Sequence, residues 1–226
     1  MGAKAKRGLV QMRAFLFDFD GVIVDSEPLH LQTFRETLAP LGITIPEKRW
    51  YVEFTGRGSP YIMKTLLGEI GIKDEKLVKK YVDARRELFG KRIGEGKLRE
   101  KRGIRKFLEG CRKEGIMLAV VSGGHKSNIL FALSKLGLEG FFELVIGRED
   151  YRNNKPDPEP YNVACRKLGA NTKDCVAFED SISGCLSAKA AGIKVVLLDS
   201  QAPPDTASFK PHLKVKDFEG LEPGDI

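Results

Sequence analysis

The sequence predicts an α/β fold, with a Rossmann-like core built on a parallel β-sheet and an inserted helical cap. Two observations lead to this prediction. Short apolar runs alternate with amphipathic stretches of helical length, which is the pattern of strands joined by crossover helices. In addition, a long interval between the first and second apolar runs, residues 20–116, contains helical patterns and no comparable run. This interval indicates that a helical segment interrupts the sheet.

Five apolar runs predict the strands of the sheet. The first is "AFLFDF" at 14–19, and the others lie at 117–122, 144–147, 175–180 and 194–199. Their interiors consist of Val, Ile, Leu and Phe with little alternation, which is typical of strands buried on both faces. We therefore expect helices on both sides of the sheet.

Amphipathic stretches between these runs predict the covering helices, at 104–114, 127–135, 158–168 and 182–191. A glycine follows each of them, and a left-handed helix cap favours this residue type. The four glycines are Gly115, Gly137, Gly169 and Gly192.

Helical patterns also fill the long interval, at 28–41, 59–67 and 74–89. Ser59 precedes Pro60, and this pair predicts a helix start in which the Ser59 hydroxyl caps the helix and proline occupies its first position. We expect a core domain of residues 12–27 and 92–226, a helical cap domain of residues 28–91, and a disordered tail of residues 1–11.

The composition limits the function classes. The 226 residues carry a net charge of +7, but the basic residues are scattered among acids, which argues against a nucleic-acid partner. No apolar run approaches the ~20 residues that cross a membrane. The basic N-terminus lacks an apolar signal core, and no C-x-x-C motif occurs, so we expect a cytoplasmic protein with reduced thiols. These thiols belong to Cys111, Cys165, Cys175 and Cys185. A chain that carries its own cap is expected to be a monomer.

Polar residues follow four of the five predicted strands. Ligands of an open parallel sheet bind beyond the carboxyl ends of its strands, so these residues are expected to meet in one mouth. They are Asp18 and Asp20 after the first strand, Ser122, Gly123 and Gly124 after the second, Lys155 after the third, and Glu179 and Asp180 after the fourth.

Four clustered carboxylates repel one another unless a cation neutralises them. Oxygen ligands with few His or Cys residues favour Mg²⁺. The hydroxyl of Ser122, the amide of Gly123 and the ammonium of Lys155 are donors suited to a phosphate dianion. A magnesium ion beside a phosphate cradle indicates phosphoryl transfer, in which a carboxylate can act as the nucleophile.

Four segments in this order resemble the haloacid dehalogenase-like (HAD) hydrolase superfamily. They are "DFDGVIVDS", "VVSGG", "NNKPDPEPY" and "FEDSISGCLSAKAAGI". The resemblance covers essentially the whole chain and places the helical insert where C1-capped members of subfamily I carry their cap. Within that subfamily, the chain is most similar to the group of β-phosphoglucomutase and phosphoglycolate phosphatase.

The resemblance implies a role for each residue of the mouth. Asp18 would be the nucleophile that forms an aspartyl-phosphate, and Asp20 the general acid and then the base. Lys155 would bind the phosphoryl group and orient Asp18. Ser122 and Gly123 would also hold the phosphoryl group. The magnesium ligands would be Asp18, Asp20 through its carbonyl, Glu179 and Asp180.

Three residues of the insert are candidates for substrate contact. The spacing between Asp18 and His30 resembles that of a histidine which β-phosphoglucomutases use near the substrate. The segment "FTGRGS" resembles the cap loop of the family, which makes Arg57 and Ser59 candidates. The mutase carries an arginine where this chain has Ser59, and this difference argues against a mutase.

The leading hypothesis is a Mg²⁺-dependent phosphomonoester hydrolase that acts on a small phosphorylated metabolite through an aspartyl-phosphate. Asp20 favours phosphate esters over carbon–halogen bonds, because dehalogenases lack an aspartate at this place. The alternative is a hexose-phosphate mutase. A third hypothesis is a phosphate-binding module without catalysis.

Overall fold

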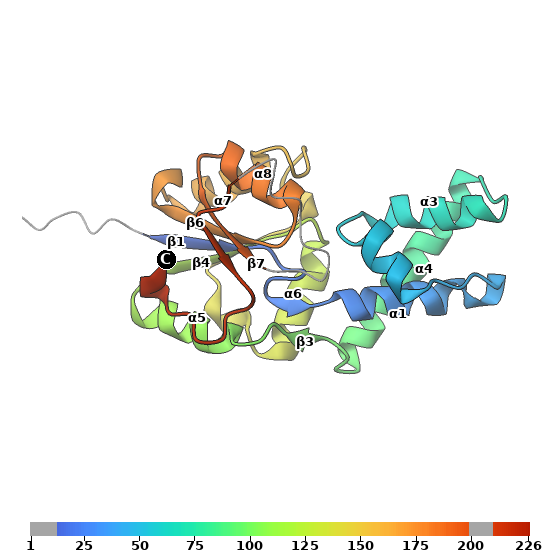
Figure 1. The fold of residues 1–226 in the computed structure, drawn as a ribbon, viewed down its shortest axis with the longest axis horizontal. Coiled ribbons are helices and arrows are strands. Elements are labelled where there is room, and N and C mark those ends of the chain that lie inside the picture. The colour runs from blue at the N-terminus through green and yellow to red at the C-terminus, as the bar shows by residue number, and fades with distance from the viewer. Residues whose placement is uncertain (1–12, 199–209) are drawn as a thin grey trace, which may run out of the picture.

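A computed structural model describes residues 13–198 and 210–226. Its main feature is a six-stranded sheet with the order β5-β4-β1-β6-β7-β8, in which every neighbouring pair is parallel (Figure 1). The strands are β1 (Ala14–Phe17), β4 (Met117–Val121), β5 (Leu144–Ile146), β6 (Cys175–Glu179), β7 (Lys194–Leu198) and β8 (Leu213–Val215). The predicted parallel α/β sheet is therefore confirmed.

The five predicted strands begin where the sequence predicts, but β1, β4, β5 and β6 end one or two residues earlier. β1 stops at Phe17 instead of Phe19, because the chain turns at Asp18. β8 was not predicted, since its three residues are only half-buried or exposed and lack a strong apolar pattern. The predicted tail, residues 1–11, and the predicted last residue of β7, Asp199, lie outside the described residues.

Side chains from the two faces of β1 enter two different apolar clusters. Phe15 and Phe17 pack in the cluster that contains residues of α5 and α6, whereas Ala14 and Leu16 pack in the cluster of α7 and α8. Figure 1 shows α7 and α8 on one side of the sheet and α5 on the other. These helices are α5 (Ile104–Lys113), α6 (Lys126–Leu136), α7 (Glu159–Leu168) and α8 (Ile182–Ala190). All four are within two residues of their predicted limits.

The interval between β1 and β4 contains helices that extend away from the sheet (Figure 1). The long ones are α1 (Glu27–Leu38), α3 (Ser59–Glu69) and α4 (Glu75–Gly94). Short elements lie between or beside them: β2 (Val24–Asp25), η1 (Ala39–Leu41), α2 (Glu47–Arg49), the π-helical turn η2 (Trp50–Phe54) and β3 (Arg99–Glu100). β2 and β3 pair antiparallel. The segment that leads into these helices is thereby paired with the segment that leads out of them.

A third apolar cluster lies within these helices and includes Phe34, Trp50 and Leu66. It shares no residue with the two clusters at the sheet, among the residues described. Leu29 and Phe89, however, lie within residues 28–91 and pack in the cluster that contains Phe15 and Phe17, so the division into a core and a cap of residues 28–91 stays a prediction. Helix α4 itself continues beyond residue 91, to Gly94.

The predicted capping role of Ser59 is wrong. Gly58 occupies the N-cap of α3, Ser59 is the first helical residue, and no side chain caps the helix. The Ser59 hydroxyl instead accepts a hydrogen bond from Arg85, with Nη1 and Oγ 3.2 Å apart. Because a buried guanidinium needs acceptors, this distant contact outweighs the local capping preference.

Candidate active site

A tight turn after β1 carries the two aspartates. The backbone N–H of Asp18 donates to Phe178 O at 2.9 Å, which holds the turn against β6. Gly21 has a φ of +74°, and a Cβ atom at this position would lie 1.9 Å from the carboxylate of Asp180. Glycine is therefore required both by the backbone conformation and by the close approach of Asp180.

Three carboxylates gather at the ends of β1 and β6. Oxygen atoms of Asp18, Glu179 and Asp180 all lie within 4.8 Å of one another. Burial raises the pKa of Asp18; the charge of Lys155 opposes this shift and that of Glu179 adds to it. Burial also raises the pKa of Asp180, and the charges of Asp18 and Glu179 raise it further. These acids fit a divalent cation, because a cation removes the repulsion between them.

Lys155 lies between these acids. Its Nζ is 3.2 Å from Asp18 Oδ1 and 2.6 Å from Glu179 Oε1, and it donates to Val121 O at 2.9 Å. These partners match the three N–H donors of an ammonium group. Lys155 therefore fixes Asp18 and Glu179 relative to β4.

Glu179 is completely buried and hydrogen-bonded by three side chains. Oε1 accepts from Lys155 and, at 2.6 Å, from the Tyr161 hydroxyl, while Oε2 accepts from Ser181 at 3.2 Å. Ser181 also caps α8 by accepting from Gly184 N. Sequence reasoning missed Tyr161. The only feature of the sequence that pointed to Tyr161 was an aromatic residue with a hydroxyl group on the buried face of α7.

Ser122 and Gly123 follow β4, the strand that pairs with β1. Ser122 is buried, and its Oγ accepts from Gly124 N at 3.0 Å. The Tyr151 hydroxyl donates to Ser122 O at 3.0 Å. Gly123 is exposed. The register pairs Phe17 with Val120, which brings this loop beside the turn that carries Asp18.

The side chain of Asp20 does not join the three clustered acids and instead contacts His30. His30 Nε2 lies 3.4 Å from Asp20 Oδ1. Burial raises the pKa of Asp20, but His30, Ser26 and Arg85 together outweigh burial, so the pKa lies below its ordinary value. The ring of His30 stacks on Phe89, with centroids 4.5 Å apart.

Arg85 is a second residue that sequence reasoning missed. It is 5% exposed, contacts His30 Nδ1 and donates through Nε to Thr33 Oγ1 at 3.1 Å. Burial lowers the pKa of Arg85 to about 10. The helical period of α4 places Arg85 on the same face as the buried Val78 and Phe89. A charged residue on that apolar face was the feature of the sequence that could have indicated Arg85.

The two remaining cap candidates lie in different surroundings. Ser59 contacts Arg85 and is thereby linked to His30. Arg57 is exposed, and its guanidinium lies over Tyr61, 5.4 Å from the ring centroid. The structure therefore connects His30 and Ser59 through Arg85, and the side chain of Arg57 has no recorded contact with either of them in the described chain.

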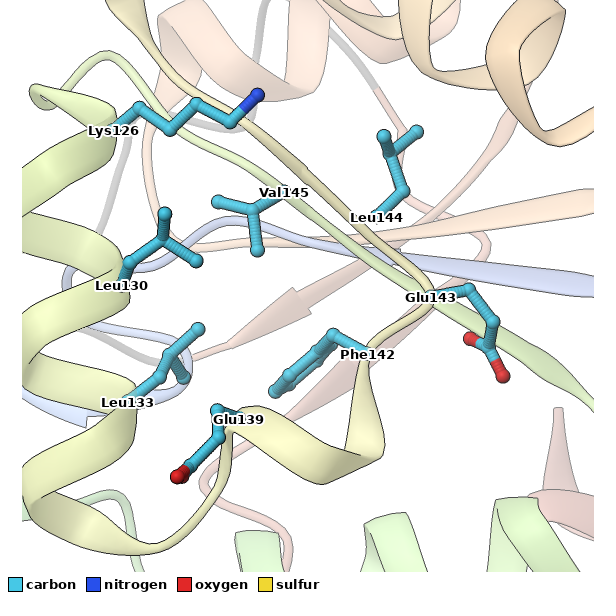
Figure 2. A pocket seen from close by; sticks show the side chains of 8 residues that line it. All are labelled: Lys126, Leu130, Leu133, Glu139, Phe142, Glu143, Leu144 and Val145. Carbon is cyan, nitrogen blue, oxygen red and sulfur yellow. The ribbon is translucent and has the colours of Figure 1, made fainter.

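A separate hollow of about 310 Å³ lies along the edge strand β5. Figure 2 shows side chains from α6 and from the segment around β5 lining it. None of the catalytic candidates contributes to this hollow, so it is distinct from the strand-end site. Its lining residues are Lys126, Leu130, Leu133, Glu139, Phe142, Glu143, Leu144 and Val145.

The structure is an α/β protein with a parallel sheet, and its acidic centre lies at the carboxyl ends of neighbouring strands. The chain belongs to the haloacid dehalogenase-like hydrolase family, whose model matches residues 15–198. This match includes all the candidate site residues and the interval of helices between β1 and β4.

Relatives and solved structures agree with this family. The chain is 32% identical over 186 residues to a phosphorylated carbohydrates phosphatase of Thermotoga maritima, covering 81% of this chain and 83% of the relative. It is 24% identical over 212 residues to a phosphoglycolate phosphatase of Mesorhizobium japonicum, covering 91% of each. The β-phosphoglucomutase structure from Clostridium difficile has a TM-score of 0.79 at 23% identity and covers 95% of both chains, which shows the same fold.

No helix within residues 13–198 and 210–226 is long and apolar enough to cross a membrane.

Proposed function

We propose that this protein hydrolyses phosphomonoesters of small metabolites with the aid of Mg²⁺, through a phosphoryl group carried by Asp18. The supporting observation is the meeting of Asp18, Glu179 and Asp180 with Lys155 at one end of the sheet. The names of the relatives as phosphatases also support the proposal.

In this proposal Asp18, Glu179 and Asp180 hold the magnesium ion together with the backbone carbonyl of Asp20. When bound, the ion offsets the negative charge of these acids and of the phosphoryl group. Lys155 orients the Asp18 carboxylate for attack on phosphorus. The hydroxyl of Ser122 and the backbone N–H of Gly123 bind the phosphoryl oxygens.

Asp20 supplies the proton chemistry. Its pKa lies below the ordinary value, so the free carboxylate suits the base role, in which it accepts a proton from water. As the acid it must first bind a proton, which then passes to the leaving oxygen. His30 is the side chain that contacts the Asp20 carboxylate, with Nε2 3.4 Å from Oδ1.

A hexose-phosphate mutase is the second candidate, favoured by the contact between His30 and Asp20. A mutase converts glucose 1-phosphate to glucose 6-phosphate when a bisphosphate activator is present, whereas a hydrolase releases only free phosphate. A non-catalytic phosphate-binding module is the third. Mg²⁺-dependent release of phosphate from any ester would rule it out.

The partner we propose is a small phosphate ester bound by a cytoplasmic monomer. All four cysteines are free and buried, which supports a reducing compartment.

Replacing the nucleophile tests the proposed function. Asp18→Asn keeps the shape of the side chain but removes its charge, so turnover of p-nitrophenyl phosphate with Mg²⁺ should fall by about a thousand-fold or more. Asp25→Asn is the matched control, because Asp25 is an exposed aspartate on β2. It should leave the rate within about two-fold. Unchanged activity of Asp18→Asn would exclude Asp18 as the nucleophile.

A further inference from the structure

Glu27 is a carboxylate beside the candidate site to which the sequence motifs assign no role. It is the first residue of α1, three positions before His30, so the two side chains share one face of the helix. His30 contacts Asp20 from that face. In Figure 1, α1 leads from the sheet into the inserted helices. Glu27 therefore lies at the boundary between the cap and the part of the site that contains Asp20.

A rigid aromatic residue holds Glu27 in place. The indole N–H of Trp50 donates to Glu27 Oε2 at 2.8 Å. Trp50 is 2% exposed and packs against Phe34 and Phe54, with ring centroids 5.3 and 5.9 Å away. The orientation of the Glu27 carboxylate is thereby fixed before any ligand binds.

The second oxygen of this carboxylate has no partner within the described residues. Glu27 forms no ion pair there, and the Trp50 bond is its one side-chain hydrogen bond. Arg85 is the nearby cation, but its guanidinium already contacts Thr33, Ser59 and His30. Burial raises the pKa of Glu27, and the charge of Asp20 adds to this shift, while His30 and the Trp50 hydrogen bond oppose it.

Such an oxygen acts as an acceptor that a ligand can complete. Glu27 is half-buried, so a ligand can reach this oxygen, and an open acceptor beside a reaction centre favours ligands that bring donors. Hydroxyl groups of a substrate can donate to Glu27 Oε1. A substrate carboxylate cannot donate, and its charge is repelled by that of Glu27.

We propose that Glu27 is a specificity-determining residue that accepts hydrogen bonds from hydroxyl groups of the leaving alcohol. It would select phosphorylated carbohydrates and polyols over phosphate esters whose leaving group carries a carboxylate. This inference rests on the proposed phosphatase function.

The experiment compares leaving groups in the wild type and in Glu27→Gln. Phosphate release is measured from a panel of pentose, hexose and hexitol monophosphates, from phosphoglycolate and 3-phosphoglycerate, and from p-nitrophenyl phosphate as the reference. In the wild type, kcat/KM should be highest for a hydroxylated, uncharged leaving group. Glu27→Gln should lower that value by about ten-fold or more, and p-nitrophenyl phosphate should change by less than about three-fold.

Two further variants separate specificity from folding. Trp50→Phe keeps the aromatic packing but removes the indole donor, so it should raise KM for the best sugar phosphate more than it lowers kcat. Glu47→Gln is the control, because Glu47 is an exposed glutamate in α2. It should leave the panel unchanged.

The outcomes distinguish the two proposals. If no ester of the panel is hydrolysed, the proposed phosphatase function fails. If esters are hydrolysed but carboxylate-bearing leaving groups are preferred, or if Glu27→Gln lowers all rates equally, the role of Glu27 is overturned while the phosphatase function stands.

Discussion

At the scale of single residues, Lys155 organises the site. It is 10% exposed and contacts two carboxylates, and one of them, Glu179, is fully buried. A buried charge is costly unless it is paired, so the lysine and the glutamate depend on each other. The same lysine orients the Asp18 carboxylate. A residue that stabilises the fold therefore also positions the proposed nucleophile.

Lys155→Ala should destabilise the protein by about 3–5 kcal/mol, because it leaves the buried Glu179 without its cation. Urea unfolding at neutral pH measures this loss. Lys64→Ala removes an exposed lysine from its pair with Glu75, whose side chains are 66% and 72% exposed, and should cost less than about 1 kcal/mol. Equal losses in the two variants would contradict the structural role of Lys155.

At the scale of elements, the start of α8 is fitted closely to the end of β6. Gly184 lies in the first turn of α8, and a Cβ atom there would be 2.0 Å from the carboxyl group of Glu179. The helix can approach the strand only because this side chain is absent. Glu179, Ser181 and Gly184 therefore form one packed unit.

Gly184→Ala should destabilise the protein strongly and abolish activity, since the fully buried Glu179 has no space into which to move. Gly90→Ala, inside α4, is the contrasting variant, because a Cβ atom at this position would have no neighbouring atom within 4 Å. It should stabilise the protein by about 0.5–1 kcal/mol, the helix-propensity difference between glycine and alanine. Thermal unfolding of both variants beside the wild type tests the pair, and a tolerated Gly184→Ala would refute the proposed fit.

The elements also show how far the sequence carries prediction. The starts of the strands and the polar residues near their carboxyl ends were predictable, because an apolar run followed by acids such as Asp18 or Asp180 is a local pattern, although the strand ends themselves were placed too late. The contact of Arg85 with His30 was not predictable, because it joins residues 55 positions apart through packing of α4 against α1. The error at Ser59 has the same origin, since its hydroxyl binds Arg85 instead of capping α3.

At the scale of the whole molecule, Asp150 links α6 and α7, two helices whose residues pack in the apolar clusters on opposite faces of the sheet. Its carboxylate accepts from Lys126 of α6 at 3.2 Å, from Lys167 of α7 at 2.8 Å and from Gly147 N at 3.0 Å. Burial raises the pKa of Asp150, but these hydrogen bonds outweigh it and hold the pKa at about 2. The ionised form is thus bound more strongly in the folded chain than in the unfolded chain.

This linkage gives stability a defined dependence on pH. The unfolded pKa of an aspartate is about 3.9, so the stabilisation by Asp150 is complete above pH ~4 and is lost as the pH falls toward 2. Asp150→Asn should therefore lower the urea midpoint at pH 6, and its difference from the wild type should shrink at pH 3. A difference of the same size at both values would contradict this account.

The antiparallel pairing of β2 with β3 has a mechanical consequence for the inserted helices. Val24 and Asp25 lie opposite Glu100 and Arg99, so the strand that enters the insertion is bonded to the strand that leaves it. The two connections cannot shift independently without breaking this ribbon. We therefore expect the two connections to act as a single hinge, so that any opening of the mouth at the strand ends would be one swing of the whole helical unit.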